Sequence, residues 1–315
     1  METVFVAMSG GIDSSFAAYL LKQQGFNVVG VTFRLVPDSS SNSADHDLAG
    51  PIRRARQTAD ILSIPHYVYD FREEFSHYVI QPFISEYRSG KTPNPCILCN
   101  TYIKFGVFAE KALRSGADKI ATGHYAQILD ENGVARIKKG ADKTKDQSYF
   151  LYGIREEVLH RTIFPLGTFT KNELKRESAR MSWEIHKAKE SQDVCFIRAG
   201  DYHTFLEPHI QLSSGPVYHV NGTCLGRHNG IHLYTVGQRR GISIPYSEAL
   251  YVIRTIPEDN SVIVGGKADL AKHMVSATPV NMFSNSSGPA KAKVRYRQKD
   301  QQCSYRLTGD TLYVE

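Results

Sequence analysis

Long hydrophobic runs are absent from this sequence. No window of about 18 consecutive apolar residues occurs, so the sequence predicts no membrane-spanning helix. The N-terminus also lacks a basic stretch that leads into a signal-like apolar segment, and we therefore expect a cytoplasmic protein with no membrane partner. Cysteine is scarce, with five residues in a chain of 315. An odd number of thiols in a reducing compartment indicates reactive or metal-binding cysteines rather than a framework of disulfides.

Neither sign of charge is in large excess, because the formal net charge is only +6. Basic residues nevertheless gather in two segments, 136–145 and 291–299. In the second segment basic side chains alternate with other residues, so a strand there would place five of them on one face. These five are Lys291, Lys293, Arg295, Arg297 and Lys299. Such a row suits contact with a phosphate backbone, and it suits a solvated edge strand equally well.

The segment Ser9–Ser15, which reads Ser-Gly-Gly-Ile-Asp-Ser-Ser, stands between a predicted buried strand (Val4–Met8) and a predicted helix (Phe16–Lys22). Its glycines allow close approach to the backbone, and its serines add hydroxyl donors. Several backbone N–H groups and the positive end of the helix can then face one anion. No Gly-Lys-Ser/Thr follows at the spacing of a Walker loop. The segment predicts a phosphate-binding loop of another kind, with a serine-capped turn as the plainer alternative.

Strand-like and helix-like segments alternate over residues 1–200. Further buried strands are predicted at 28–33, 66–70 and 119–122. Asn100 can cap a helix that runs to Arg114 and ends at Gly116. Such alternation favours the α/β class, with a parallel sheet covered by helices on both faces. Ligands of such sheets bind beyond the carboxyl ends of the strands, where Ser9, Phe33 and Gly123 all fall.

The pattern of predicted elements changes near Asp201, where the alternation of strand-like and helix-like segments ends. Short β-type runs follow, separated by Asn-Gly and Gly-Gly pairs, which predicts a small antiparallel β-rich domain. A second β-rich piece starts near Val275. We therefore expect three domains, at 1–200, 201–272 and 273–315. Within the first, Asn132-Gly133 between alternating runs predicts a hairpin turn.

Two of the cysteines form a Cys96-x-x-Cys99 pair in a loop stiffened by two prolines. Because Cys99 comes just before the expected helix start at Asn100, we expect the helix dipole to lower the pKa of its thiol. Cys195 stands between polar and apolar residues, and spacing alone does not bring it near Cys99. The remaining two, Cys224 and Cys303, are expected to be packing residues.

Seven stretches, in order along the chain, together resemble the tRNA-specific 2-thiouridylase family (MnmA-type) of the PP-loop ATP pyrophosphatases. They are Ser9–Ser15, Thr92–Asn100, Ala121–Tyr125, Lys145–Tyr152, Val194–Ile197, Gly237–Gly241 and Arg295–Gln298. The resemblance implies a PP-loop (adenine nucleotide alpha hydrolase-like) parallel-sheet domain. A small β-rich central domain and a C-terminal β-barrel-like, tRNA-binding domain, shortened here, are expected to follow.

The resemblance also implies ATP-dependent replacement of the C2 oxygen of the tRNA wobble uridine by sulfur, giving 2-thiouridine. ATP at the PP-loop would adenylate that oxygen, a Cys195 persulfide would attack C2, and Cys99 would release the sulfur and leave a Cys99–Cys195 disulfide. A persulfide sulfur carrier or a cysteine desulfurase system would supply the sulfur. Asp13 is expected near Mg²⁺-pyrophosphate. The implied ATP-binding residues are Ala7, Met8, Ser9, Gly10, Gly11, Ile12, Asp13, Ser14, Phe33 and Gly123.

Contacts with the anticodon region of tRNA are implied for six residues. They are His124, Lys145, Asp146, Gln147, Arg295 and Tyr296. The wobble base has to leave its stack to reach the ATP, as expected for an enzyme that acts on a base. This favours the phosphate-backbone interpretation of both basic segments.

One departure from the family pattern concerns Cys96, where many members carry an aspartate that has been assigned the role of general base. Either Cys96 itself substitutes for that aspartate, or another group does that work, or the role is dispensable. In an alternative, Cys96, Cys99 and Cys195 bind a 4Fe-4S cluster whose open iron site holds sulfide. A Cys-x-x-Cys pair with one distant cysteine does not decide between this cluster and the persulfide relay.

Two further functions stay open. A PP-loop synthetase that forms amide or amidine bonds would share the adenylation chemistry but would need no thiols. A non-catalytic tRNA-binding protein would show no turnover, and a shortened C-terminal region makes the affinity for RNA less certain. Replacement of Cys99 or Cys195 by Ser separates the three functions.

Overall fold

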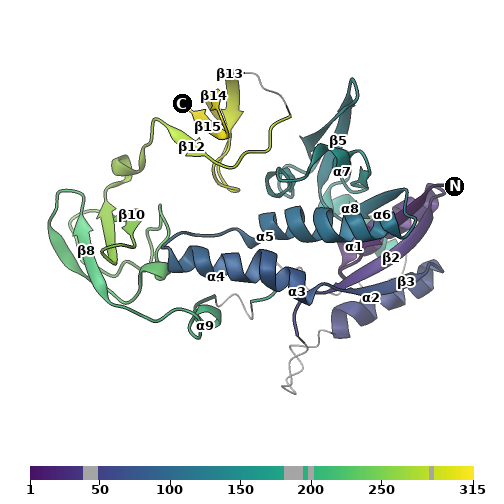
Figure 1. Cartoon of the computed structure of the whole chain (residues 1–315), viewed down its shortest axis with the longest axis horizontal. Coiled ribbons are helices and arrows are strands. Elements are labelled where there is room, and N and C mark those ends of the chain that lie inside the picture. Colours follow the sequence, from purple (N-terminus) through teal and green to yellow (C-terminus); the bar gives the residue numbers. More distant parts are fainter. Residues whose placement is uncertain (38–48, 181–193, 198–201, 284–286) are drawn as a thin grey trace. The chain divides into compact units, whose positions relative to one another are not determined.

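The computed structural model describes residues 1–37, 49–180, 194–197, 202–283 and 287–315. The chain divides into two compact units (Figure 1). Unit 1 comprises Met1–Val79 and Cys96–Gln192, and unit 2 comprises Ile80–Pro95 and Asp193–Glu315. The expected three-domain division stays a prediction.

Five parallel strands form the sheet of unit 1, in the spatial order β3-β2-β1-β4-β7. They are β1 (Thr3–Ala7), β2 (Asn27–Arg34), β3 (His66–Asp70), β4 (Lys119–Thr122) and β7 (Thr162–Ile163). This arrangement confirms the expected parallel α/β sheet. Because β2 and β4 flank β1 on opposite sides, the strand order reverses between β1 and β4. The carboxyl ends of these two strands border the position where such a sheet binds its ligand.

The helices of unit 1 bury apolar side chains. They include α1 (Ile12–Gln23), α2 (Ala49–Leu62), α3 (Arg72–Phe75), α7 (Glu156–Leu159) and α8 (Lys171–Arg180). Phe16 and Leu21 of α1 share one core with Val4 and Val6 of β1 and with Leu174 of α8. The residues that follow β1 and those that begin α8 are therefore carried by elements packed into the same core.

Residues 95–114 form one continuous helical run. It begins as α5 (Pro95–Leu98), continues as the π-helical η3 (Cys99–Val107) and ends as α6 (Phe108–Arg114). The expected helix start at Asn100 is therefore wrong. The buried Asn100 side chain instead donates from Nδ2 to Phe150 O at 2.9 Å. The expected end is confirmed, since Gly116 follows with φ of +92°.

The antiparallel pair β5 (Ala126–Glu131) and β6 (Val134–Lys139) leaves the sheet directly after Tyr125. Asn132 and Gly133 connect the two strands with φ of +58° and +83°. A two-residue hairpin turn of type I′ requires such left-handed values at both positions. The hairpin predicted from Asn-Gly is thereby confirmed.

Unit 2 contains two four-stranded sheets, of which the first has the order β10-β11-β8-β9. Its strands are β8 (Gly215–His219), β9 (Cys224–His228), β10 (Tyr251–Ile256) and β11 (Ser261–Gly265). Val217, Val252 and Val262 are fully buried in its core. β11 pairs with β8 in parallel, whereas the other two pairs are antiparallel. The expected β-rich character is confirmed, but the sheet is not purely antiparallel.

The second sheet of unit 2 is antiparallel, in the order β12-β15-β14-β13. It consists of β12 (Val275–Ala277), β13 (Gly288–Ala292), β14 (Gln301–Thr308) and β15 (Thr311–Val314). The expected strand over 291–299 is wrong, because β13 ends at Ala292 and residues 294–298 form bends and turns. Arg295 Nη2 donates to Val236 O at 3.1 Å, and Lys293 Nζ lies 5.2 Å from the ring centroid of Tyr296. The five basic side chains therefore do not line one strand face.

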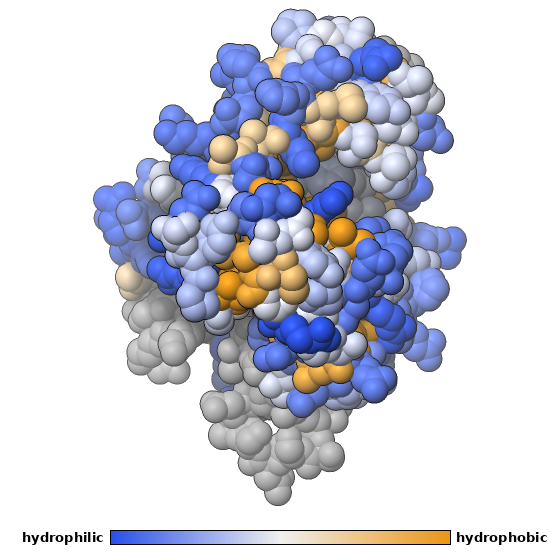
Figure 2. Space-filling view, turned by 90° about the vertical axis from the view of Figure 1, so that its left-hand side faces the viewer, coloured by the Kyte–Doolittle hydropathy of each residue, from blue (hydrophilic) through white to orange (hydrophobic). Residues whose placement is uncertain are grey.

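Figure 2 looks at the side of the molecule where β8 and β10 lie in Figure 1. Hydrophilic side chains cover most of this face, and smaller groups of hydrophobic side chains lie between them. Large apolar side chains that are exposed in unit 2 are Leu212, Val220, Val236, Tyr246, Met274, Val275 and Val294. Among the described helices, none is both long and apolar enough to cross a membrane.

Candidate functional site

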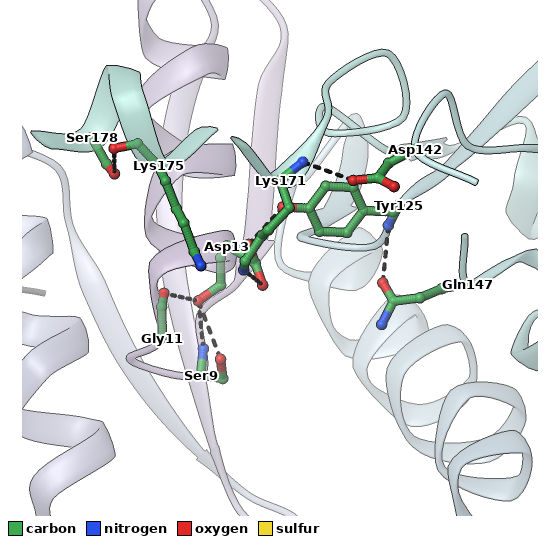
Figure 3. A network of polar contacts seen from close by, with 10 residues as sticks. Ser9, Gly11, Asp13, Tyr125, Asp142, Gln147, Lys171, Lys175 and Ser178 are labelled. Atoms are coloured by element: carbon green, nitrogen blue, oxygen red, sulfur yellow. Dashed lines mark hydrogen bonds and ion pairs between the residues drawn. The ribbon is translucent and has the colours of Figure 1, made fainter. Parts of the chain in front are cut away.

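The segment from Ser9 to Ser14 contains the turn after β1 and the first residues of α1, and we call it the Ser9–Ser14 loop (Figure 3). Hydrogen bonds of its own hydroxyl groups hold it together. Ser14 Oγ donates to Gly11 O at 3.0 Å and accepts from the Ser9 N–H at 3.1 Å. No side chain caps the start of α1 at Gly11 in the part of the chain that the structure describes. The first-turn N–H groups of α1 therefore keep their hydrogen-bonding capacity for an anion, which fits the phosphates of a nucleotide.

Two glycines permit the close packing of this loop. Gly10 has φ of +71°, and a Cβ at this position would lie 2.2 Å from Pro51 O. At the end of β4, a Cβ on Gly123 would lie 2.9 Å from the backbone nitrogen of Ser14. The structure thus brings Gly123 against the loop, and the role of both in ATP binding stays a prediction. Phe33, expected in the same site, is half-buried near the end of β2.

Asp13 is held by two side chains from distant parts of the sequence (Figure 3). Lys171 Nζ lies 2.6 and 2.8 Å from its carboxylate oxygens, and Tyr125 Oη donates to Oδ1 at 2.8 Å. The Lys171 side chain is only 6% exposed. Sequence reasoning missed this lysine. Thr170 and Glu173 form a capping box, which indicates that a helix starts at Lys171. The residues around Lys171 in the sequence do not indicate which loop its side chain faces.

Cys99 lies inside the helical run of residues 95–114 and not before its start. Cys99 is 8% exposed as a residue, whereas Cys96 is exposed. Burial raises the pKa of the Cys99 thiol, and the positive charge of Lys104 opposes this rise only in part. The expected lowering of the pKa by a helix dipole is therefore wrong, because the positive end of the helix lies at Pro95 and the thiolate would lose its hydration.

His124 is a buried histidine that is neutral at ordinary pH, since burial and then the charge of Lys104 hold its pKa well below the usual value. Thr122 Oγ1 lies 2.6 Å from Nδ1, and Lys104 Nζ lies 3.3 Å from Nε2. A lysine ammonium only donates, so Nε2 accepts and Nδ1 carries the proton that is donated to Thr122. Both ring nitrogens are thus engaged inside the protein, and the contact of His124 with tRNA stays a prediction.

Two of the other expected tRNA contacts, Asp146 and Gln147, use their side chains to shape their own loop. Asp146 is 8% exposed and accepts from the Gly140 N–H at 2.9 Å and from Ser148 Oγ at 2.8 Å. Gln147 Oε1 accepts the Tyr125 N–H at 2.9 Å (Figure 3). Gln147 therefore connects this loop to the tyrosine that holds Asp13. Contacts of Lys145, Asp146 and Gln147 with tRNA stay predictions.

In unit 2, Cys195 is exposed while its neighbours in sequence are anchored. The ring of Phe196 lies 5.3 Å from that of Phe83 in α4 (Gln81–Arg88) and 5.3 Å from that of Phe205 in α9 (Tyr202–Leu206). Ile197 is buried in the same cluster. An accessible thiol on an anchored turn suits exchange of sulfur with another molecule. Cys195 belongs to unit 2 and Cys99 to unit 1, and the disulfide between them stays a prediction.

Asp13 offers the kind of ligand that Mg²⁺ prefers, a carboxylate oxygen, in the Ser9–Ser14 loop. Across residues 1–37, 49–180, 194–197, 202–283 and 287–315, no three or more His, Cys, Asp or Glu side chains lie close enough together to hold a metal ion. A magnesium ion at Asp13 therefore stays a prediction, and most of its other ligands would have to be nucleotide phosphates and water. A 4Fe-4S cluster on Cys96, Cys99 and Cys195 stays an alternative.

Comparison with known proteins covers almost the whole chain. Residues 2–199 match the family model described as tRNA methyl transferase HUP domain, and residues 203–266 match that of the tRNA methyl transferase PRC-barrel domain. The chain is 42% identical to the tRNA-specific 2-thiouridylase MnmA of Syntrophotalea carbinolica, over 98% of this chain and 88% of that protein. It is 38% identical to the tRNA-specific 2-thiouridylase MnmA of Clostridioides difficile, over 99% and 90%. A solved 4-thiouridine synthetase–RNA complex with bound ATP is similar at a TM-score of 0.39 and 19% identity, over 59% of this chain and 42% of that chain.

Proposed function

The chain belongs to the family of tRNA-specific 2-thiouridylases, and from this membership we propose that it is a transferase that uses ATP to replace the C2 oxygen of the tRNA wobble uridine by sulfur. The family expected from the sequence motifs is thereby confirmed. The observation that carries the proposal is the uncapped loop from Ser9 to Ser14, which lies where the strand order reverses and bears Asp13.

The loop supports the activation step of this reaction. A uridine carbonyl oxygen is a poor leaving group, and its transfer to AMP makes it a good one. The N–H groups at the start of α1 and the hydroxyls of Ser9 and Ser14 would hold the phosphates, while the C2 oxygen attacks the α-phosphorus and pyrophosphate departs. Magnesium bound near Asp13 would neutralise charge on the departing phosphates.

In the sulfur-transfer step, Cys195 would carry the sulfur and Cys99 would release it onto the uridine. A Cys195 persulfide, charged by a sulfur carrier or a cysteine desulfurase, would attack C2 with its terminal sulfur and displace AMP. The Cys99 thiolate would then attack the Cys195 sulfur. The S–S bond breaks, its electron pair stays on the sulfur bound to C2, and a Cys99–Cys195 disulfide forms for a thiol reductant to clear. The exposure of Cys195 supports its role, because a sulfur-donor protein has to reach it.

Contacts with the anticodon region of tRNA are supported by two joined loops of unit 2. Arg295 donates to Val236 O, so the loop after β13 touches the chain just before the Gly237–Gly241 segment, which carries Arg239 and Arg240. Arginines gathered in this way suit phosphate groups of RNA. Lys145 in unit 1 stands in the loop that Asp146 and Gln147 shape.

Replacement of single cysteines tests the proposal. The variants Cys99→Ser and Cys195→Ser are assayed for thiolation of tRNA on mercury-containing gels, together with their binding of ATP and tRNA. We expect both to lose thiolation and to keep both ligands. Thiolation retained in both variants would overturn the persulfide relay. Activity that needs no thiol would point to an amide-forming synthetase, and a wild type that binds tRNA without any turnover would point to a binding protein.

Cys96 distinguishes the relay from the iron–sulfur alternative. In the relay, Cys96→Ser keeps thiolation if the exposed Cys96 is a bystander, and lowers thiolation without any bound iron if Cys96 replaces the family's aspartate as base. As a cluster ligand the same residue would be needed both for activity and for bound iron. Anaerobic purification followed by quantitation of iron and acid-labile sulfide measures the second quantity. Stoichiometric iron that is lost in Cys96→Ser would establish the cluster.

A further inference from the structure

Lys171 and Asp13 form an ion pair beside the phosphate-binding loop although 158 positions separate them in the sequence. Lys171 is the first residue of α8, and this helix is fixed at two points. Its backbone N–H donates to Asp142 Oδ2 at 2.9 Å, which fixes the first turn of α8. Leu174, on the same helix, is fully buried in the core that also holds Val6. The position of the ammonium group is therefore set by the fold.

The charge of Asp13 presents a problem for an anion-binding loop. Asp13 lies in the first turn of α1, whose N–H groups attract negative charge. A carboxylate left unpaired on this rim would repel a polyphosphate at short range, where partial burial weakens screening. Lys171 contacts both carboxylate oxygens and so offsets this charge. Lys175, which lies on the same face of α8 one turn further on, extends toward the loop (Figure 3).

We propose that Lys171 is a positioning residue of the nucleotide site, which holds the Asp13 carboxylate in place and offsets its charge so that the phosphates of ATP can enter the loop. This inference rests on the proposed function, since it concerns the same ATP site. A merely structural ion pair would behave differently. Its loss would lower the stability of the fold, and removal of the Asp13 charge would not restore nucleotide affinity.

A double-mutant cycle in ATP affinity tests the proposal. The affinity of the full-length protein for ATP is measured by titration calorimetry in EDTA, where no divalent cation can replace the lysine. The variants are Lys171→Met, Asp13→Asn and the combination of both. Arg176→Met is the matched control, because it removes one positive charge from an exposed position of the same helix. Thermal melting reports the stability of each variant in parallel.

We expect Lys171→Met to weaken ATP binding about tenfold, and Arg176→Met to leave it nearly unchanged. The double variant should bind ATP within about threefold of Asp13→Asn, because the unpaired charge is then gone. Equal affinities of Lys171→Met and the wild type would overturn the proposal, as would additive losses in the double variant.

Two further comparisons distinguish a failure of this inference from a failure of the variant to fold and from a failure of the proposed function. If Lys171→Met does not fold, the double variant is compared with Asp13→Asn alone, and a large remaining difference in affinity overturns the proposal. If the wild type itself binds no ATP, with or without magnesium, the proposed function fails. If the wild type binds ATP and Lys171→Met binds it equally, only the role of Lys171 fails.

Discussion

Tyr125 donates its phenolic proton to the Asp13 oxygen, Oδ1, that Lys171 Nζ approaches at 2.6 Å. One carboxylate oxygen thus receives a neutral and a charged donor at the same time. Tyr125 is 3% exposed, and its backbone N–H is in turn bound by Gln147. The orientation of Asp13 is therefore determined by residues far from the Ser9–Ser14 loop in sequence.

Tyr125→Phe removes the neutral donor and keeps the ring. We expect a loss of about 1.5–3 kcal/mol in stability, the usual net contribution of a hydrogen bond to a charged group. Because Lys171 still holds and neutralises Asp13, ATP affinity should fall less than in Lys171→Met. Thermal melting and ATP titration measure the two effects. An equal fall in ATP affinity in Tyr125→Phe and Lys171→Met would contradict the expectation that Lys171 contributes more to ATP binding than Tyr125.

Gly10→Ala tests the shape of the loop. Its left-handed φ and a Cβ placed 2.2 Å from Pro51 O force the backbone to move, so we expect destabilisation above the roughly 1–3 kcal/mol of backbone strain alone, and loss of ATP binding. Gly25→Ala is the matched control. Gly25 has φ of +87° but no atom within 4 Å of its Cβ position, so this variant has the strain without the clash. ATP binding that survives in Gly10→Ala would show that the loop can shift without loss of function.

The sequence contains enough local information for some of these features and not for others. Asn132-Gly133 and Ser9–Ser15 are recognisable because glycine, asparagine and serine at those positions meet backbone requirements within a few residues. The pair of Lys171 with Asp13 was missed because it depends on where α8 packs. A capping box tells where a helix begins but not which neighbour its side chains face.

The error at Cys99 has a related cause. Asn100 is a good cap by type, but Asn94-Pro95 carries a competing signal for a helix start, and the run does begin at Pro95. The pKa of the Cys99 thiol then depends on burial, which local sequence does not report. The basic alternation over 291–299 failed for another reason, since the bends after Ala292 end the strand before the row can form.

Lys104→Met tests the electrostatics around the thiols. Lys104 lowers the pKa of Cys99 against the larger effect of burial, so its removal should raise that pKa further. In a protein whose other cysteines are replaced by Ser, the pH profile of iodoacetamide alkylation should move to higher pH. Lys111→Met, which removes a charge from an exposed position of the same helical run, should leave the profile in place. Identical profiles for Lys104→Met and the wild type would contradict the assignment.

His124 makes stability depend on pH in one direction. Its pKa in the folded protein lies well below the unfolded value of about 6.5, so unfolding takes up a proton at mildly acidic pH. The full contribution of neutral His124 to the free energy of unfolding is present above the pKa that His124 has in the unfolded chain. As the pH falls from there toward the lower pKa of the folded protein, the free energy of unfolding decreases by up to about 1.4 kcal/mol per pH unit. His124→Gln should therefore lose less stability than the wild type between about pH 7.5 and about pH 5.5. Melting temperatures at the two pH values measure this, and equal losses would contradict it. The pKa values of His66, His228 and His232 are also lowered, so these residues add to the loss of stability at acidic pH equally in the wild type and in His124→Gln.

The hydrogen bonds of Tyr125 also have a consequence for how the two substrates affect each other. Gln147 stands in the loop proposed to meet tRNA, Asp13 in the loop proposed to hold ATP, and both bind this one tyrosine. If each substrate favours the same arrangement of Tyr125, tRNA must raise the affinity for ATP by the factor by which ATP raises the affinity for tRNA, because such coupling is reciprocal. We expect this factor to exceed one. The nucleotide would then be bound most tightly when a uridine is present to accept it, which limits idle consumption of ATP.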